Sequence, residues 1–356
     1  MMTHRHAFEA LDITLQDIMD KDLPFGGKIV ILGGVSRQVL PVVPNGTRAQ
    51  TVDACAVRST LWEKFEVLRL KENMPARDDP SFSEFLLRVG DGEEPSLDGE
   101  LIKVPDEMVI PWQGEDSVDT LIEVVFPNLL DKGMDKDYMV VRGLITPLNE
   151  HVDKLNGNII NMFPGDEVTY HSFDSVQDDT RNLYQQEFLN SMSPGGLPPH
   201  ILVLKLGSPI MLLRNIDPKN GPCNGTRLIC KGFYRHLIDA EIVTGHYAGK
   251  RVFIPRIPLK PPEHIKFPFT LIRKQFPIRL SFALTINKAQ GQTIPNVGIY
   301  LPEDVFSHGQ LYVALSRGVS KATTKVLVKK TNEERGNSTF TKNVVYKEVP
   351  FSCNSG

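Results

Sequence analysis

Cysteine is scarce in this sequence, and the few cysteines form no metal-binding pattern. Cys55, Cys223, Cys230 and Cys353 are scattered, with no CxxC pair and no cluster of cysteine and histidine. This spacing argues against a zinc site and favours a reducing, intracellular environment. Long apolar runs are missing too. No stretch of about 18 apolar residues could cross a membrane, and the start, MMTHRHAFEALD, lacks the apolar segment of a secretion signal.

Positive charge is also not in excess. The 40 lysines and arginines are outnumbered by 43 aspartates and glutamates, which gives a formal net charge of −3. If nucleic acid binds, it must therefore use a local surface rather than the overall charge of the chain. At 356 residues, of which 41% are hydrophobic, the chain is long enough for two domains with cores of their own.

What the sequence does contain is an alternation of apolar runs and amphipathic segments, which predicts an α/β fold with parallel strands. Between about 200 and 262, short strand-like runs separated by Gly, Pro and Asn predict a small inserted barrel or sandwich. Helices are expected at 8–18, from Asp79-Pro80 to Gly90, at 117–130 and after Asn149, and buried strands at 28–34, 65–70, 138–147 and 281–286.

The segment GGVSRQVLP places polar side chains directly after the first predicted strand. A glutamine at such a strand end, here Gln38, positions water or contacts a terminal phosphate through a side chain that both donates and accepts hydrogen bonds. The alternative is an ordinary strand-to-loop junction with a solvated Arg37.

Two later segments have the same design. In TINKAQGQT, the backbone amides near Gly291 together with Lys288 and Gln290 suit the phosphate oxygens of a nucleotide or of DNA; the alternative is a polar turn. The helix LYVALSR ends in Arg317, and an arginine forks onto a terminal phosphate. The alternative here is an arginine that only complements the dipole at a helix C-terminus.

Together these segments resemble the ordered motifs of the Pif (petite integration frequency) DNA helicases, most closely a plant subgroup related to rolling-circle transposon helicases. The resemblance runs from Met2 to about Lys329, and its last two motifs are highly specific. The similar stretches are GKIVILGGVSRQVLPVVP, LKENM, LITPLNEHVDKLN, MLLRN, GPCNGTRL, LTINKAQGQT and LYVALSR.

The resemblance implies a fold and an activity. The fold would be α/β, with two RecA-like parallel-sheet domains, the first incomplete at 1–130 and the second at 131–330, a small β-barrel insert at about 205–262, and a tail at 331–356. The activity would be ATP-dependent 5′-to-3′ unwinding of DNA in repair, recombination and telomere maintenance. ATP and Mg²⁺ would be the cofactors, and a single-stranded or forked DNA the partner of a monomer. The location would be the nucleus, with the mitochondrion as the alternative.

The resemblance also assigns residues. Gln38 matches the glutamine that contacts the γ-phosphate, and Arg317 matches the arginine finger; both are expected to be catalytic. Gln290 and Gly291 complete the expected nucleotide contacts. The expected DNA contacts are Thr146, Asn149, Thr285, Asn287 and Lys288, and no metal ligand is assigned.

Several family features are missing from this sequence. It contains no GxxxxGK[ST] cradle for the phosphates, and Gly26-Gly27-Lys28 runs into a predicted strand instead of a helix. The Asp-Glu pair that holds magnesium would lie just before the segment matching Met2, so the chain is expected to be truncated at its N-terminus. Val35 stands where the family has an acidic residue, and Pro75 where it has an arginine.

Three interpretations follow from these departures. The chain belongs to an ATP-dependent helicase but does not hydrolyse ATP by itself. Alternatively it is a non-enzymatic binder of single-stranded DNA, in which HIKFPFTLIRKQFPIRLSF interleaves Lys266, Arg273, Lys274 and Arg279 with Phe267, Phe269, Phe276 and Phe282. For this stretch, adjacent half-buried strands are the alternative. The third interpretation is a truncated gene model or gene copy without function.

Overall fold

The structure is a computed structural model that describes residues 3–44, 46–68, 70, 73–177, 183–262, 265, 267–329 and 340–349. Its contacts divide the chain into two compact units. The first comprises Met1–Trp112, Ala289–Thr293 and Leu301–Gly356, and the second comprises Gln113–Lys288 and Ile294–Tyr300. The sequence predicted domains that end at residues 130 and 330 from their resemblance to RecA-like folds. The division above follows contacts instead, so these boundaries stay a prediction.

The first unit contains four α-helices among its described residues: α1 (Arg5–Met19), α2 (Arg48–Asp53), α3 (Pro80–Asp91) and α10 (Gln310–Leu315). Short 3-10 helices lie between them at Pro24–Gly27, Ala56–Arg58, Trp62–Lys64, Met74–Ala76 and Asp106–Met108. Strands β1 (Ser96–Leu97), β2 (Leu101–Lys103) and β18 (Phe340–Lys342) form an antiparallel sheet, while β3 (Val109–Ile110) and β17 (Thr324–Val328) pair in parallel.

The predicted helix at Asp79-Pro80 is confirmed, but its end is not where the sequence suggested. The Asp79 side chain accepts a hydrogen bond from the amide of Phe82 and so caps α3. The helix runs past Gly90 and stops at Gly92, which is in the left-handed region. Gly90 is needed inside the helix because a Cβ there would lie 2.6 Å from Cδ of Arg37 and 2.8 Å from Cδ2 of Tyr312.

The predicted buried strands at 28–34 and 65–70 are wrong. The described residues of both segments carry no strand assignment, and Ile29 and Ile31 are 95% and 90% exposed. A run of β-branched residues shows that a segment suits burial in a sheet, but a strand also needs neighbours for its backbone hydrogen bonds. No described strand pairs with either segment. The polar loop that carries Gln38 therefore follows an extended apolar segment instead of a strand.

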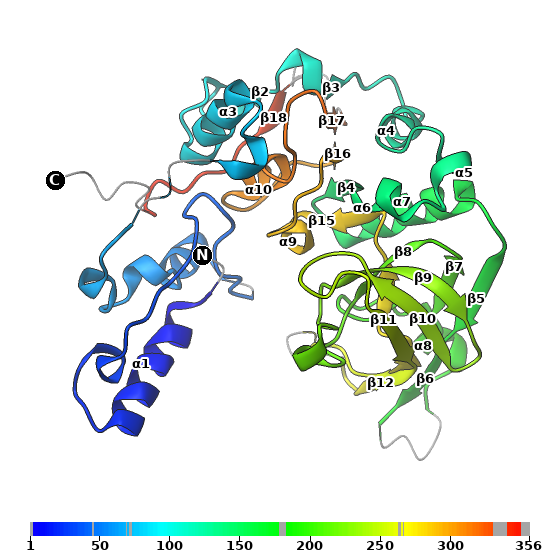
Figure 1. Ribbon diagram of the computed structural model, residues 1–356, viewed down its shortest axis with the longest axis horizontal. Coiled ribbons are helices and arrows are strands. Elements are labelled where there is room, and N and C mark those ends of the chain that lie inside the picture. Colours follow the sequence, from blue (N-terminus) through cyan, green and yellow to red (C-terminus); the bar gives the residue numbers. More distant parts are fainter. Residues whose placement is uncertain are drawn as a thin grey trace. The chain divides into compact units, whose positions relative to one another are not determined.

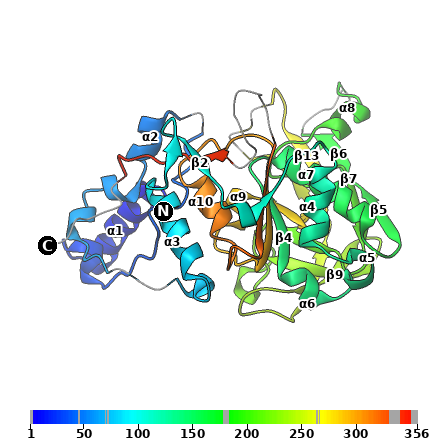
Figure 2. The same cartoon turned by 90° about the horizontal axis from the view of Figure 1, so that it is seen from above.

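The second unit contains three parallel strands: β4 (Arg142–Thr146), β15 (Ala283–Thr285) and β16 (Asn296–Leu301). Helices α4 (Ser117–Val125) and α7 (Asn149–Met162) pack against β4 (Figure 2). The predicted helix at 117–130 is interrupted, because a second helix, α5 (Leu129–Lys132), follows after Asn128 in the left-handed region. The predicted strand at 138–147 is shorter than expected, since α6 (Lys136–Val140) occupies its start.

The strand-rich insert is an antiparallel sheet in the order β11-β10-β9-β8-β14 (Figure 1). Its strands are β8 (Pro209–Leu212), β9 (Arg227–Phe233), β10 (Leu237–Ile242), β11 (Arg251–Pro255) and β14 (Ile278–Leu280). Two smaller antiparallel sheets are formed by β12 (Ile257–Leu259), β13 (Leu271–Gln275) and β6 (Phe173–Val176), and by β5 (Glu167–His171) and β7 (Ile201–Lys205). Two short helices, α8 (Gln186–Ser191) and α9 (Ile286–Ala289), complete the elements.

The mixed α/β architecture with parallel strands confirms the predicted fold class. In the part of the chain that the structure describes, no helix is both long and apolar enough to cross a membrane.

Candidate nucleotide and nucleic-acid sites

Gln38 and Gln290 lie against each other in the first unit. Nε2 of Gln290 donates to Oε1 of Gln38 at 2.7 Å. Oε1 of Gln290 is buried and has no hydrogen-bond partner among the described residues. A buried polar atom without a partner destabilises a fold by about 1–3 kcal/mol, and a water or a ligand that bonds to it removes this cost. The pair is therefore incomplete within the described chain, as expected of side chains that contact a ligand.

The loop that carries Gln38 is fixed by its neighbours. Arg37 donates from Nε and Nη2 to the two carboxylate oxygens of Asp91 at 2.7 and 2.8 Å, and this hydrogen bonding raises the pKa of Arg37. Nδ1 of His308 accepts from the amide of Tyr346, so its Nε2 carries the proton and donates to the Ser36 carbonyl at 3.2 Å. Arg37 is thus a structural clamp, and the alternative of a solvated Arg37 is wrong.

Arg317 follows the end of α10 and is 7% exposed. Its guanidinium donates to the carbonyls of Val313 and Gln292 at 2.9 and 2.7 Å and to the Ser316 hydroxyl at 2.9 Å. Burial lowers the pKa of Arg317. The bond to Val313 closes the last turn of the helix, as the alternative interpretation expected. The bond to Gln292 ties Arg317 to the segment that holds Gln290, so the role of an arginine finger stays a prediction.

Gly291 also lies in this segment. It has a φ of +79°, and a Cβ there would meet no atom within 4 Å. The glycine is therefore required by its backbone conformation rather than by crowding, and its exposed amide lies beside Gln290.

In the second unit, Thr146 and Thr285 end adjacent parallel strands and are direct partners in the register of β4 and β15. Their side chains differ in exposure. Thr146 is fully buried, and its hydroxyl has no partner among the described residues. Thr285 is half-buried and accepts a hydrogen bond from the amide of Lys288 at 3.3 Å. Thr285 therefore shapes the turn into α9, while Thr146 presents no hydroxyl at a surface.

Three cations gather near this strand edge, and we call Arg214, Arg279 and Lys288 the basic cluster. Nζ of Lys288 donates to Asn224 at 3.1 Å, and Nη1 of Arg279 donates to Asn149 at 3.3 Å. The pKa of Lys288 is lowered by burial and by the positive charges of Arg279 and Arg214. Asp153 lies 3.6 Å from Nε of Arg279 and offsets part of this charge, and the remaining positive charge at the surface forms a site that an anion stabilises.

Sequence reasoning selected only part of this site. It proposed Asn149, Asn287 and Lys288; Asn149 and Lys288 belong to the hydrogen-bonded network, and the exposed Asn287 precedes Lys288 on α9. Asn149 is the first residue of α7 rather than its cap. Arg214 and Asn224 were missed as site residues, and Arg279 was named only among the interleaved cations at 264–282. The motifs MLLRN and GPCNGTRL contain Arg214 and Asn224, so a signal was present for both.

Within 264–282 the structure favours the alternative of half-buried strands, β13 and β14, over a row of exposed platforms. Phe276 and Phe282 are fully buried core residues, and Arg273 is fully buried in an ion pair with Asp174. Lys266 lies outside the described residues. Phe267 and Phe269 remain partly exposed, with stacked rings 5.9 Å apart.

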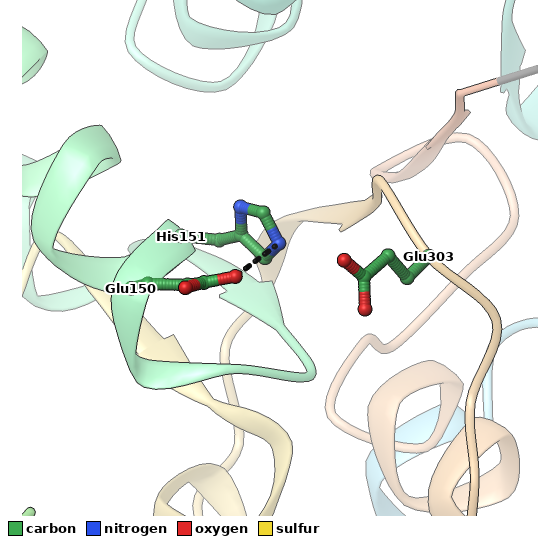
Figure 3. Close-up of side chains that lie close together, drawn as sticks. All are labelled: Glu150, His151 and Glu303. Carbon is green, nitrogen blue, oxygen red and sulfur yellow. Dashed lines mark ion pairs between the residues drawn. The ribbon is translucent and has the colours of Figure 1, made fainter. Parts of the chain in front are cut away.

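The edge beside Asn149 is not uniformly basic. Glu150 and His151, the next two residues of α7, form an ion pair of 3.5 Å between Oε1 and Nε2 when His151 is protonated (Figure 3). Glu150 is 71% exposed, so this pair stabilises the fold by less than about 1 kcal/mol. Glu303, which the same figure labels, belongs to the first unit.

Comparison with known proteins shows similarity to one helicase family in two segments of the chain. The model of the family described as "PIF1-like helicase" matches residues 1–100, and that of "DNA helicase Pif1, 2B domain" matches residues 187–233. Over these two segments the chain is similar to Pif1-like helicases. The second match covers part of the antiparallel sheet that the sequence predicted as a small insert.

The curated relatives of this family are longer than the chain. The ATP-dependent DNA helicase PIF1 of Rattus norvegicus is 30% identical over 190 residues, which are 52% of this chain and 27% of the rat protein. Its namesake in Homo sapiens is 25% identical over 342 residues, 92% of this chain and 44% of the human protein. The chain thus spans less than half the length of these relatives.

Solved Pif1 structures share the fold. The Candida albicans Pif1 helicase matches with a TM-score of 0.59 and 23% identity, covering 95% of this chain and 72% of that chain. A Bacteroides Pif1 helicase, solved in complex with ADP-AlF3 and single-stranded DNA, matches with a TM-score of 0.61 and 19% identity, covering 96% and 75%. The α/β fold predicted from the motifs is therefore that of Pif1 helicases.

Proposed function

We propose that this chain is part of an ATP-dependent DNA helicase, and that single-stranded DNA binds at the basic cluster of its second unit. The observation that carries the proposal is the grouping of Arg214, Arg279 and Lys288 beside Asn149 and Asn224. Guanidinium, ammonium and amide donors at a strand edge suit the phosphates of a nucleic-acid backbone. The Bacteroides neighbour solved with single-stranded DNA supports this choice of ligand.

The first unit would contact the terminal phosphate of ATP. Gln38 and Gln290 fit that role because their side-chain amides are hydrogen-bonded to each other, while Oε1 of Gln290 has no partner among the described residues. Bound ATP would supply the free energy of unwinding. The other phosphates and the Mg²⁺ do not fit the residues present. The sequence has no GxxxxGK[ST] to hold the phosphates, and the candidate nucleotide residues include no carboxylate to bind the metal. We therefore expect no ATP hydrolysis from this chain by itself.

A second candidate function is non-enzymatic binding of single-stranded DNA. The exposure of Ile29 and Ile31 favours it, because the segment that leads to Gln38 is not held in a sheet.

In either case we propose a monomer that acts on single-stranded or forked DNA, in repair, recombination or telomere maintenance in the nucleus. A fluorescent fusion that stays outside the nucleus would contradict the proposed location.

The two candidates and the absence of function are separated by a pair of assays on the full chain. Fluorescence anisotropy with a labelled dT oligonucleotide measures binding, and phosphate release measures ATP hydrolysis with and without that oligonucleotide. We expect salt-sensitive binding that Lys288→Ala and Arg279→Ala weaken. Lys132→Ala, an exposed lysine on α5, is the matched control and should change nothing. Hydrolysis of ATP that the oligonucleotide stimulates would overturn our expectation that this chain alone is inactive. A chain that neither binds the oligonucleotide nor hydrolyses ATP would contradict both candidate functions.

A further inference from the structure

Four aromatic side chains of the second unit belong to neither candidate site, although they gather on each other. The rings of Tyr184 and Phe269 have centroids 4.3 Å apart, and Tyr184 and Phe188 are stacked at 6.4 Å with an interplanar angle of 21°. Phe267 and Phe269 are stacked at 5.9 Å and 15°. Phe188 is 49% exposed and the other three are half-buried. We call these four residues the aromatic patch.

The inner side of the aromatic patch rests on a core. Tyr184 and Phe269 pack against the buried cluster of Leu189, Leu197, Leu259 and Leu271. These contacts hold the rings in place, so little side-chain entropy is lost when another flat group stacks on them. An exposed aromatic surface with fixed rings is what proteins use as a platform for the bases of single-stranded nucleic acid.

The aromatic patch and the basic cluster are connected through one turn. Arg279 donates from Nη2 to the carbonyl of Leu197, a residue of the core under the patch, at 3.2 Å. Arg214 donates from Nη1 to the neighbouring carbonyl of Gly196 at 3.1 Å. A Cβ on Gly196 would lie 3.0 Å from Cγ of Pro262, so this turn also lies against Pro262.

Lys260 adds a positive charge between the two features. Its carbonyl accepts from Nη2 of Arg214 at 3.1 Å, and its exposed ammonium donates to Gln177 at 2.7 Å. The backbone N–H of Gln177 in turn donates to the carbonyl of Thr270, which is next to Phe269 in the chain. Cations therefore extend from the basic cluster to the edge of the aromatic patch.

We propose that the aromatic patch stacks on the bases of a single-stranded DNA whose phosphates lie on the basic cluster and Lys260. The inference rests on the proposed function, since it assigns a second part of the same DNA surface. Adjacent positive charge favours nucleic acid over an apolar protein partner, because every base has a flat face and every nucleotide carries a phosphate. The bases, rather than the phosphates, would supply the binding energy at this position.

The test compares two oligonucleotides of equal length on the full chain: labelled dT and a strand with abasic sites in place of the bases. Phe267→Ala and Phe188→Ala should weaken binding of dT at least about fivefold, leave binding of the abasic strand unchanged, and leave the salt dependence unchanged. Phe253→Ala is the matched control, because Phe253 is 61% exposed on β11 and lies outside the patch. Phe188→Trp should restore binding of dT.

The outcomes separate the inference from the proposed function. If the wild-type chain binds dT with a strong salt dependence and both patch variants behave like Phe253→Ala, the inference is overturned and the proposed function stands. Equal loss on dT and on the abasic strand would also overturn it, as would a patch variant that changes the sedimentation of the chain instead of its DNA affinity. If the wild-type chain binds neither strand, both proposals fail. Phe188, the most exposed ring, provides a variant that leaves the core intact.

Discussion

Replacing Arg273 by leucine should destabilise the second unit strongly. Arg273 is fully buried and donates to both carboxylate oxygens of Asp174, at 2.9 and 2.7 Å. It also donates to the carbonyls of Leu189, Met192 and Pro198. The substitution leaves a buried carboxylate without its counter-charge, which destabilises by about 3–5 kcal/mol, and three carbonyls with one donor fewer. We therefore expect a loss of at least about 4 kcal/mol in the free energy of unfolding.

The loss is measured by urea denaturation followed by far-UV circular dichroism, with hydrogen exchange at β6 and β13 to show where the protection disappears. Lys154→Ala is the control, because its ion pair with Glu115 is long, at 3.8 Å, and both side chains are more than half exposed; it should change stability by less than about 1 kcal/mol. In the double variant Arg273→Leu with Asp174→Leu the loss should be smaller than in Arg273→Leu alone. A loss below about 1 kcal/mol for Arg273→Leu would refute the reasoning.

Three further predictions concern the first unit. Burial lowers the pKa of His308 in the folded chain, so below the unfolded pKa of about 6.5 the unfolded chain binds a proton on this histidine more tightly than the folded chain does. The free energy of unfolding therefore decreases as the pH falls below about 6.5. Melting temperatures between pH 7.5 and 5.5 should therefore fall less in His308→Gln than in the wild type, and equal slopes would contradict this. Gly309→Ala should destabilise by about 1–3 kcal/mol in a urea titration, because φ is +71° and the new Cβ would lie 2.4 Å from the Arg37 carbonyl; an unchanged midpoint would argue against the close approach. Limited digestion with thermolysin should cut first near Ile29 and Ile31, which are exposed, and early cuts within β4 instead would show that these residues are protected.

The sequence predicted correctly those helices and strands that find packing or hydrogen-bonding neighbours among the described residues. Helix α3 follows from Asp79, Pro80 and its apolar face, and strands β4 and β15 follow from apolar runs that do find neighbours. The segments at 28–34 and 65–70 have the same apolar character but no neighbours among the described strands. Apolar patterning reports suitability for burial, and pairing decides whether a strand forms.

The candidate sites were predicted unevenly for a similar reason. Motif matching placed Gln38 near Gln290 although 252 positions separate them. The interleaving at 264–282 named Arg279 as one cation among four, but its contact with Asn149 is created only by the fold. Phe276 and Phe282 belonged to the same pattern and are buried, because an alternation of phenylalanine and cation does not show which face of a strand meets the core.

The central claim is that the second unit binds single-stranded DNA through the phosphates at the basic cluster, and its most direct test is the salt dependence of binding to a dT oligonucleotide. Three phosphate contacts predict a slope of log K against log salt concentration of about −2, which is about 20-fold weaker binding at 200 mM than at 50 mM salt. The double variant Lys288→Ala with Arg279→Ala should retain a slope of about −0.7. A wild-type slope near zero, or a slope that the double variant leaves unchanged, would contradict the account.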